Sequence, residues 1–303
     1  MKCRLKIFYL LISMIVIFCS TTGYGAFSVL AIGKSFASLS TKESYSDPFT
    51  HIVMPYRLYV PQNYDDSKEY QLILFLHGAG ESGTDNISQI KNNKLFETLI
   101  SDNYIEAYPC IVVAPQSATG WSSNELITVM NILKNLESNY NIDDERQVLT
   151  GYSMGGTGVW NMLLLYPDYF DAAVTVAGGR VYGNLESIKD IPIWIFHAQN
   201  DGTVSVECSR QMYKALTDLD ANVFMSEPTT GGHNHNVVAF SSTALYDWLF
   251  SKDFKLPSKR KDNEFLTIAI TVGAVAAVTA AGTTIAVIAK RRKAKIKSSD
   301  SFE

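Results

Sequence analysis

Residues 147–156 read QVLTGYSMGG, and the fold class can be predicted from this stretch. The pattern G-x-S-x-G occupies residues 151–155, with a β-type run before it and a helical stretch after it. Alone, the pattern is common in glycine-rich loops, but this strand–turn–helix setting is what a nucleophile elbow requires. The serine of an elbow sits on a tight turn, so the residues two positions away must be small, as Gly151 and Gly155 are. The sequence therefore predicts Ser153 as a nucleophile at a helix N-terminus, where backbone N–H groups favour negative charge.

The chain on both sides of the elbow alternates between apolar β-type runs and helical stretches. Several runs, such as LILFL and IWIF, are continuously apolar, which suits strands buried on both faces. The alternation predicts an α/β fold with a mostly parallel sheet flanked by helices. Residues 34–50, rich in Ser, Thr and charge, are predicted to be a loose lead-in. The predicted strands are 51–60, 70–76, 110–114, 147–150, 172–177, 193–196 and 221–225, and the predicted helices are 87–100, 124–140, 155–165, 207–219 and 243–250.

An acid that accompanies an elbow serine should follow it in the chain, because the order in such sites is Ser, then Asp or Glu, then His. Asp201 lies in a loop directly after the apolar run 193–196. The carboxyl ends of parallel strands are where active groups collect, so Asp201 is the predicted acid. An ordinary turn role in Asn-Asp-Gly is its alternative. Weaker candidates, in helix-end or linker contexts, are Asp168, Asp171 and Asp190.

Two of the chain's five histidines lie late enough to serve as the base, namely His233 and His235 in the run GGHNH. The glycines before His233 permit a close approach to Ser153, so His233 is favoured and His235 stays an alternative. The pair forms H-x-H, but no third ligand is spaced nearby, so no metal site is predicted. No organic cofactor is implied.

Two backbone amides are predicted to stabilise the negative charge that develops on a substrate carbonyl. One is the N–H of Met154, directly after the nucleophile. The other should come from the turn after an earlier strand, and LILFL ends in HGAG at residues 77–80. Ala79 is the predicted donor, with Gly80 close behind, whereas His77 is predicted to shape the turn.

Two tryptophans and two cysteines can also be assigned roles from their positions. Trp121 is a candidate for lining a substrate pocket, whereas Trp160, on the helix after the elbow, is predicted to be a core residue. Cys110 opens an apolar run and is also predicted to be core, although export would permit a disulfide with Cys208.

The N-terminus has the features of a secretory signal peptide. Basic residues are followed by an apolar run from Ile7 to Cys19 and then by small residues. We expect cleavage after Gly25, which would remove residues 1–25. An uncleaved anchor is the alternative, although an apolar run of this length is short for a full span of a bilayer.

The C-terminal segment 265–289 carries no charge and is long enough to cross a bilayer core of about 30 Å. A basic tail, 290–303, follows it directly, which predicts a cytoplasmic tail by the positive-inside rule. We therefore expect a single-pass protein of the cell membrane. Its body at 26–254 would lie outside the cell, joined by a polar stalk at 255–264 to the transmembrane helix.

Charge is unevenly distributed along the chain. Three of the 26 basic residues precede residue 26 and six follow residue 264, whereas these ends hold only two of the 30 acidic residues. The region between them therefore carries 17 basic and 28 acidic residues. A body this acidic argues against nucleic acid or anionic lipid as its partner.

Five stretches together resemble the esterase-like α/β-hydrolases, which include predicted peptidases, phospholipase/carboxylesterases and feruloyl or polyhydroxybutyrate-depolymerase-like esterases. In chain order these stretches are LILFLHGAGESGTDN, VVAPQ, GYSMGGTGVWNMLLLYPDYFDAAVTVAGG, IFHAQNDGTVSVECSRQM and GGHN. The resemblance covers about residues 50–250 and implies the α/β-hydrolase fold. It also implies Ser153, Asp201 and His233 as nucleophile, acid and base, since the family usually has Gly-His-Asn at the base. The acid loop reads HAQND where many members have HGxxD, and the membrane segment is not part of the family's core pattern.

Three functions compete. The first is a carboxylic-ester hydrolase that cleaves short acyl or aromatic-acyl esters, free or linked to polysaccharide, through a Ser-His-Asp triad and an acyl-enzyme. The second is a serine peptidase with the same triad, although such peptidases often carry a propeller or large cap that does not fit within residues 26–264. The third is a non-catalytic surface binding protein, which the full set of motifs argues against.

Overall fold

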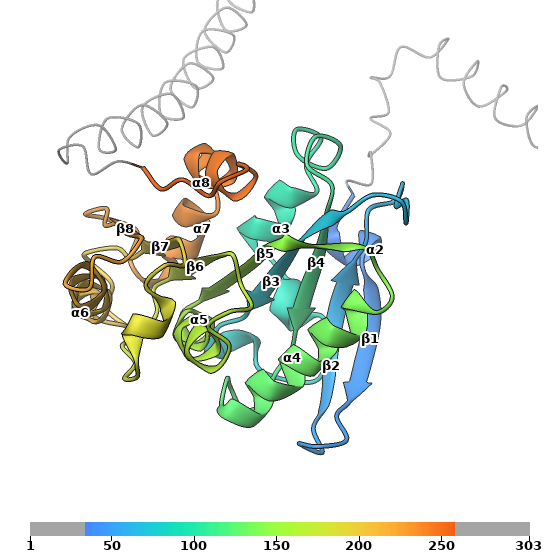
Figure 1. The fold of residues 1–303 in the computed structure, drawn as a ribbon, viewed down its shortest axis with the longest axis horizontal. Coiled ribbons are helices and arrows are strands. Elements are labelled where there is room, and N and C mark those ends of the chain that lie inside the picture. The colour runs from blue at the N-terminus through green and yellow to red at the C-terminus, as the bar shows by residue number, and fades with distance from the viewer. Residues whose placement is uncertain (1–33, 258–303) are drawn as a thin grey trace, which may run out of the picture. The chain divides into compact units, whose positions relative to one another are not determined.

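Eight strands form one sheet, in the order β1-β2-β4-β3-β5-β6-β7-β8. The strands β3 to β8 run parallel, whereas β1 and β2 are antiparallel additions at one edge (Figure 1). This confirms the predicted mostly parallel sheet. The strand bounds are β1 Thr41–Ser46, β2 Val53–Tyr59, β3 Tyr70–Leu76, β4 Cys110–Pro115, β5 Ile142–Tyr152, β6 Ala172–Val176, β7 Ile193–Phe196 and β8 Val223–Ser226.

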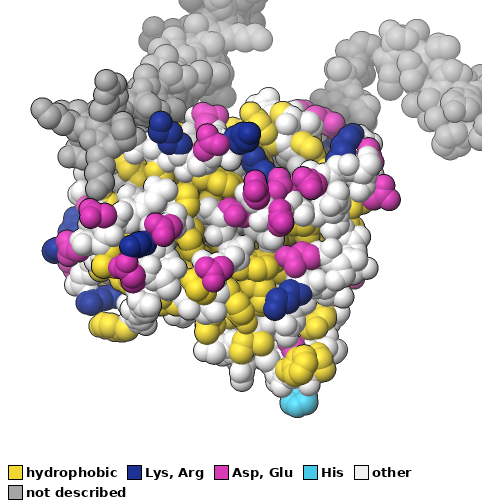
Figure 2. Space-filling model, viewed as in Figure 1, with side chains coloured by type: hydrophobic (Ala, Val, Ile, Leu, Met, Phe, Trp, Pro, Cys, Tyr) yellow, Lys and Arg dark blue, Asp and Glu magenta, His cyan; other side chains and the backbone are white. Residues whose placement is uncertain are grey.

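The computed structural model describes residues 34–257. The expected signal peptide (1–25), transmembrane segment (265–289), basic tail (290–303) and most of the expected stalk lie outside the described residues. None of the helices within 34–257 combines the length and the apolar character needed to cross a bilayer. Figure 2 shows acidic side chains across the viewed face, in keeping with the acidic composition of the body.

Helices cover both faces of the sheet. One buried cluster joins α4, α5 and α6 to side chains such as Leu72 and Leu74 of β3. A second cluster joins α2, α3 and α8 to Ile73 and Phe75 of the same strand. Because successive side chains of a strand point to opposite faces, β3 is buried on both sides, as its continuous apolar run predicts. The helix bounds are α2 Phe36–Leu39, α3 Lys94–Leu99, α4 Ser123–Glu137, α5 Met154–Leu165, α6 Val206–Thr217, α7 Asn236–Ala239 and α8 Thr243–Leu249.

The predicted loose lead-in at 34–50 is wrong. The short helix α2 buries Phe36, whose ring stacks on Phe96 with centroids 4.3 Å apart. Strand β1 then pairs with β2, from Thr41 opposite Leu58 to Ser46 opposite Val53. The sequence TKESYS conceals this edge strand because most of its side chains are exposed and its pairing uses backbone groups.

The predicted helix 87–100 is broken in two. A 3-10 turn, η2 (Ser88–Ile90), is separated from α3 by Asn92, which adopts a left-handed backbone with φ 52°. Asn93 then caps α3, since its side chain accepts a hydrogen bond from the N–H of Leu95.

The residues assigned to the core behave as expected, and the two cysteines are not bonded to each other. Trp160 is fully buried, and Cys110 is 3% exposed. Burial raises the pKa of the Cys110 thiol to about 12. Cys208, on α6, is a free thiol as well. The fold of the described region therefore rests on its apolar core.

Candidate active site

The elbow at the end of β5 holds Ser153 in a strained backbone conformation. Its φ is 57° and its ψ is −118°, and it is the N-cap of α5. A non-glycine residue in such a region costs about 1–3 kcal/mol, and conformations of this kind concentrate at functional sites. The glycines around it allow the close packing that the turn needs. A Cβ at Gly151 would lie 2.4 Å from the carbonyl oxygen of Gly155, and one at Gly156 would lie 2.7 Å from that of Val176.

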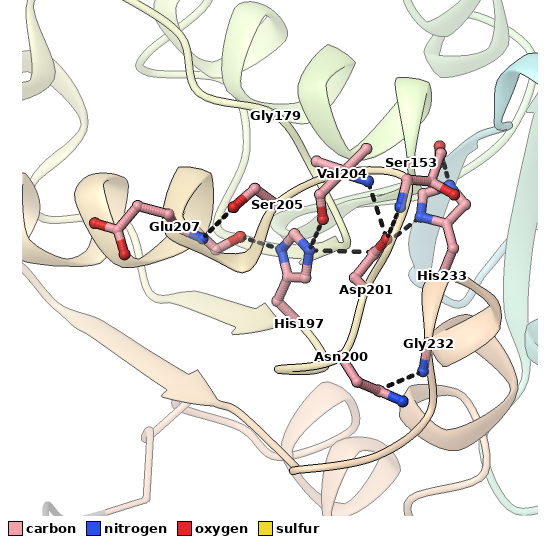
Figure 3. A network of polar contacts seen from close by, with 12 residues as sticks. Ser153, Gly179, His197, Asn200, Asp201, Val204, Ser205, Glu207, Gly232 and His233 are labelled. Carbon is pink, nitrogen blue, oxygen red and sulfur yellow. Dashed lines mark hydrogen bonds and ion pairs between the residues drawn. The ribbon is translucent and has the colours of Figure 1, made fainter.

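Three predicted side chains from separate segments meet at the carboxyl edge of the sheet. The Oγ of Ser153 lies 2.8 Å from Nε2 of His233. The Nδ1 of His233 lies 2.8 Å from Oδ2 of Asp201. Ser153 follows β5, Asp201 follows β7, and His233 opens η4 (His233–His235) after β8 (Figure 3). The side chains thus form one hydrogen-bonded chain from a hydroxyl through an imidazole to a carboxylate.

The alternatives to Asp201 lie elsewhere. Asp168, Asp171 and Asp190 all precede β6 or β7, whereas Asp201 follows the carboxyl end of β7. Asp171 instead accepts a hydrogen bond from the N–H of Gln147, at the start of the apolar part of β5. The side chain of His235 lies outside what the structure describes, so the contacts above concern His233 alone.

The carboxylate of Asp201 is fully buried and held at both oxygens. Its Oδ1 accepts the N–H groups of Thr203 (2.8 Å) and Val204 (2.9 Å), while Oδ2 faces His233. Burial favours the neutral acid and acts to raise the pKa of Asp201, but the hydrogen bonds from His233, Val204 and Thr203 outweigh it. The pKa of Asp201 is therefore lower than usual, and the group stays ionised.

Two hydrogen bonds hold the segment that carries His233. Gly232, with φ 57°, donates its N–H to Oδ1 of Asn200 at 2.8 Å. The hydroxyl of Tyr152 donates to the carbonyl of His233 at 2.8 Å. Burial, followed by the charges of Glu81 and Asp201, raises the pKa of Tyr152 to about 12, so this donor keeps its proton. These bonds hold the imidazole against the elbow.

Both predicted oxyanion donors are the first residue of a helical turn. Met154 opens α5, and Ala79 opens the 3-10 turn η1 (Ala79–Glu81). The first N–H groups of a helix have no acceptor within it, so they are free to bind an anion. A Cβ at Gly78 would lie 3.4 Å from Cβ of Ser153, so the HGAG turn lies directly against Ser153.

Behind this turn lie His77 and Trp121, both buried. The Nε2 of His77 accepts the N–H of Ser117 at 3.0 Å, and burial lowers the pKa of this imidazole. The indole N–H of Trp121 donates to the carbonyl of His77 at 2.9 Å. Trp121 is 6% exposed and packs on Gly158 of α5. It therefore contacts both the HGAG turn and α5, the helix that begins directly after Ser153.

Sequence reasoning missed two further ionisable residues of the site. Glu81 is half-buried, and its Oε2 lies 3.0 Å from where a Cβ at Gly78 would stand. Burial raises the pKa of Glu81. His197, fully buried, lies 3.2 Å from Asp201 through Nε2. The sequence does place His197 directly after the apolar run 193–196 and four residues before Asp201, and this position could have identified it. Within residues 34–257, no group of three or more His, Cys, Asp or Glu is arranged to hold a metal ion.

The sheet order and a strained serine between β5 and α5 define an α/β-hydrolase-like fold. Residues 51–274, more than half of the chain, match the family described as "Putative esterase". The chain therefore belongs to this family of esterases.

Known relatives agree with this membership. An Aspergillus terreus protein named "Probable feruloyl esterase C" is 29% identical over 161 residues, which are 52% of this chain and 58% of the relative. The solved structure of a thermostable esterase is similar with a TM-score of 0.66 and 34% identity, over 70% of this chain and 62% of that one. An acylaminoacyl peptidase shares the fold with a TM-score of 0.53 and 16% identity, over 74% of this chain and 43% of that one. Each match thus covers less than two thirds of the length of the other protein.

Proposed function

We propose that this protein is a serine carboxylic-ester hydrolase that acts through Ser153, His233 and Asp201. The single observation that carries the proposal is the continuous chain of contacts from Oγ through the imidazole to the buried carboxylate, 2.8 Å at each step. Such a chain activates a hydroxyl that is otherwise a weak nucleophile. Membership of an esterase family supports an ester as its substrate.

The geometry supports the following reaction. Nε2 of His233 takes the proton of Ser153 as Oγ attacks the ester carbonyl carbon. The amides of Met154 and Ala79 bind the oxyanion of the tetrahedral intermediate. When that intermediate collapses, the C–O bond to the alcohol breaks and His233 returns the proton to the leaving alkoxide. A water molecule, deprotonated by His233, then attacks the acyl-enzyme, and as the bond to Oγ breaks His233 returns this proton to Ser153 and the acid is released. Asp201 holds the imidazole and stabilises its cation.

We propose short acyl or aromatic-acyl esters, including esters on polysaccharide, as the substrate class. The support is the relative named for feruloyl ester cleavage and the similar solved esterase. The mechanism described here needs no metal or organic cofactor.

The alternative is a peptidase with the same three residues, favoured by the fold shared with an acylaminoacyl peptidase. The two readings separate in one assay of the purified full chain, with p-nitrophenyl acetate and an aminoacyl p-nitroanilide side by side. We expect ester cleavage that disappears in Ser153→Ala, and an anilide rate at the Ser153→Ala background. Comparable cleavage of the anilide would establish the peptidase instead. Turnover of neither compound would support a binding protein on a hydrolase scaffold.

We also propose that the body acts outside the cell and is held at the membrane by residues 265–289. The support is the sequence alone: an uncharged run followed by basic residues, and a signal-like N-terminus. In cells that express the chain with a C-terminal tag, external protease should remove the esterase domain and leave the tag intact. Release of the whole chain by alkaline carbonate, without detergent, would contradict the anchor.

A further inference from the structure

A second histidine, His197, contacts the Asp201 end of the Ser153–His233–Asp201 chain. His197 directly follows β7, and its side chain is fully buried. Its Nε2 has two acceptors in range, the carbonyl of Val204 at 2.9 Å and Oδ2 of Asp201 at 3.2 Å (Figure 3). Since both partners are acceptors, Nε2 must carry a hydrogen. The same Oδ2 receives His233 on its other side, at 2.8 Å.

The other ring nitrogen of His197 has a partner as well. Nδ1 lies 2.7 Å from Oγ of Ser209, which is on α6 and 1% exposed. In the neutral ring with its hydrogen on Nε2, Nδ1 accepts the hydroxyl proton of Ser209. Helix α6 therefore fixes the ring orientation that presents Nε2–H to the acid loop, in the way that an outer partner orients a metal-bound histidine.

Residues 197–204, the loop that carries Asp201, are joined to one another by internal hydrogen bonds. His197 donates to the carbonyl of Val204, and the N–H of Val204 donates to Oδ1 of Asp201. The ring of His197 touches Oδ2 of the same carboxylate. His197 therefore contacts Asp201 in two ways, through the peptide of Val204 and by the 3.2 Å approach of Nε2 to Oδ2. The side chains of His197 and Asp201 are both fully buried, so these contacts are shielded from solvent.

We propose that His197, oriented by Ser209, is a positioning residue that holds the Asp201 carboxylate in the geometry His233 needs. This inference rests on the proposed function, since it assigns a role within the same site. His197 does not touch Ser153, so any effect on the reaction must pass through Asp201. That dependence makes the inference testable by coupling between variants.

The experiment is a double-mutant cycle in the full chain, with p-nitrophenyl acetate as substrate and the acylation rate with a fluorophosphonate as a second readout. We expect His197→Phe to lower kcat by about 10- to 100-fold with KM nearly unchanged, because it removes both the hydrogen bond to the carbonyl of Val204 and the contact with Oδ2 of Asp201. In an Asp201→Asn background the same change should cost less than about threefold, because the group it positions is already impaired. His197→Gln, which keeps a donor near the Nε2 position, should recover most of the loss.

Two further variants distinguish a positioning role of His197 from a general loss of stability. Ser209→Ala leaves His197 in place and should lower kcat by about threefold to tenfold, again only when Asp201 is intact. Gln71→Met is the matched control, because Gln71 is also buried and loses two hydrogen bonds, to Leu249 and Arg146, at the amino end of β3. It should lower stability without changing kcat.

The outcomes are separable. Equal losses from His197→Phe in both backgrounds, or a loss that appears in KM alone, would show that His197 supports the fold only. Failure of Gln to rescue would point the same way. If the unaltered chain hydrolyses no ester, or if Ser153→Ala leaves hydrolysis intact, the proposed function fails first.

Discussion

Replacing His233 by alanine should reduce kcat/KM for ester hydrolysis by about 10⁴- to 10⁶-fold, the range found when a serine triad loses its base. The reason is geometric. Nε2 of His233 is the group that lies within hydrogen-bond range of Oγ of Ser153, at 2.8 Å. Without it, attack on the carbonyl leaves the hydroxyl proton with no acceptor, and the leaving alkoxide has no proton donor. Only binding and the backbone amides would then remain to lower the barrier.

The matched control is His235→Ala, two residues along the same turn, which should retain activity within a few-fold. Steady-state kinetics on p-nitrophenyl acetate and the labelling rate of a fluorophosphonate should fall together in His233→Ala. A reversed result, with His235→Ala inactive and His233→Ala active, would transfer the base to His235 and invalidate the proton path described above.

Gly155→Ala should destabilise the fold by more than about 4 kcal/mol or prevent folding. A Cβ at this position would lie 1.9 Å from the carbonyl oxygen of Leu76 and 2.7 Å from that of His77. Both atoms are backbone at the end of the central strand β3, so no side chain can turn aside to make room. The change would force α5 away from the sheet, and it would displace Ser153 from the HGAG turn.

Gly202→Ala is the comparison for Gly155→Ala, since a Cβ at Gly202 meets nothing within 4 Å. Its stability should stay within about 0.5 kcal/mol of the unaltered chain. Thermal unfolding, followed by circular dichroism, measures both changes. Equal melting temperatures for the two variants would mean that α5 does not approach β3 as closely as the contact of Gly155 with Leu76 requires.

Much of the fold follows from local patterns. The runs 70–76 and 193–196 were predicted with the bounds that β3 and β7 have, because a strand buried on both faces must be apolar at every position. The elbow was predicted because its turn tolerates only small residues at fixed spacing from Ser153. Strand β1 escaped prediction for the opposite reason, since its exposed side chains carry no pattern and only its pairing with β2 makes it a strand.

Part of the candidate site could also be predicted from the sequence. The order Ser, Asp, His along the chain was enough to nominate Ser153, Asp201 and His233. The amides of Met154 and Ala79 could be nominated because each begins a turn next to a recognisable motif. The roles of the expected signal peptide and membrane segment stay predictions from the sequence.

The class of fold and the candidates Ser153, Asp201 and His233 could be predicted from the sequence, because they depend on residue types and on their order along the chain. The side chains that surround these candidates could be identified only in the folded structure. Trp121, a candidate pocket residue from its position in the sequence, donates its indole N–H to the carbonyl of His77. His197 lies 3.2 Å from the carboxylate of Asp201, four residues along the chain, and it forms a hydrogen bond with Ser209 on the next helix. Such contacts depend on the direction of each side chain after the sheet and its helices have packed, and linear spacing carries no record of that direction.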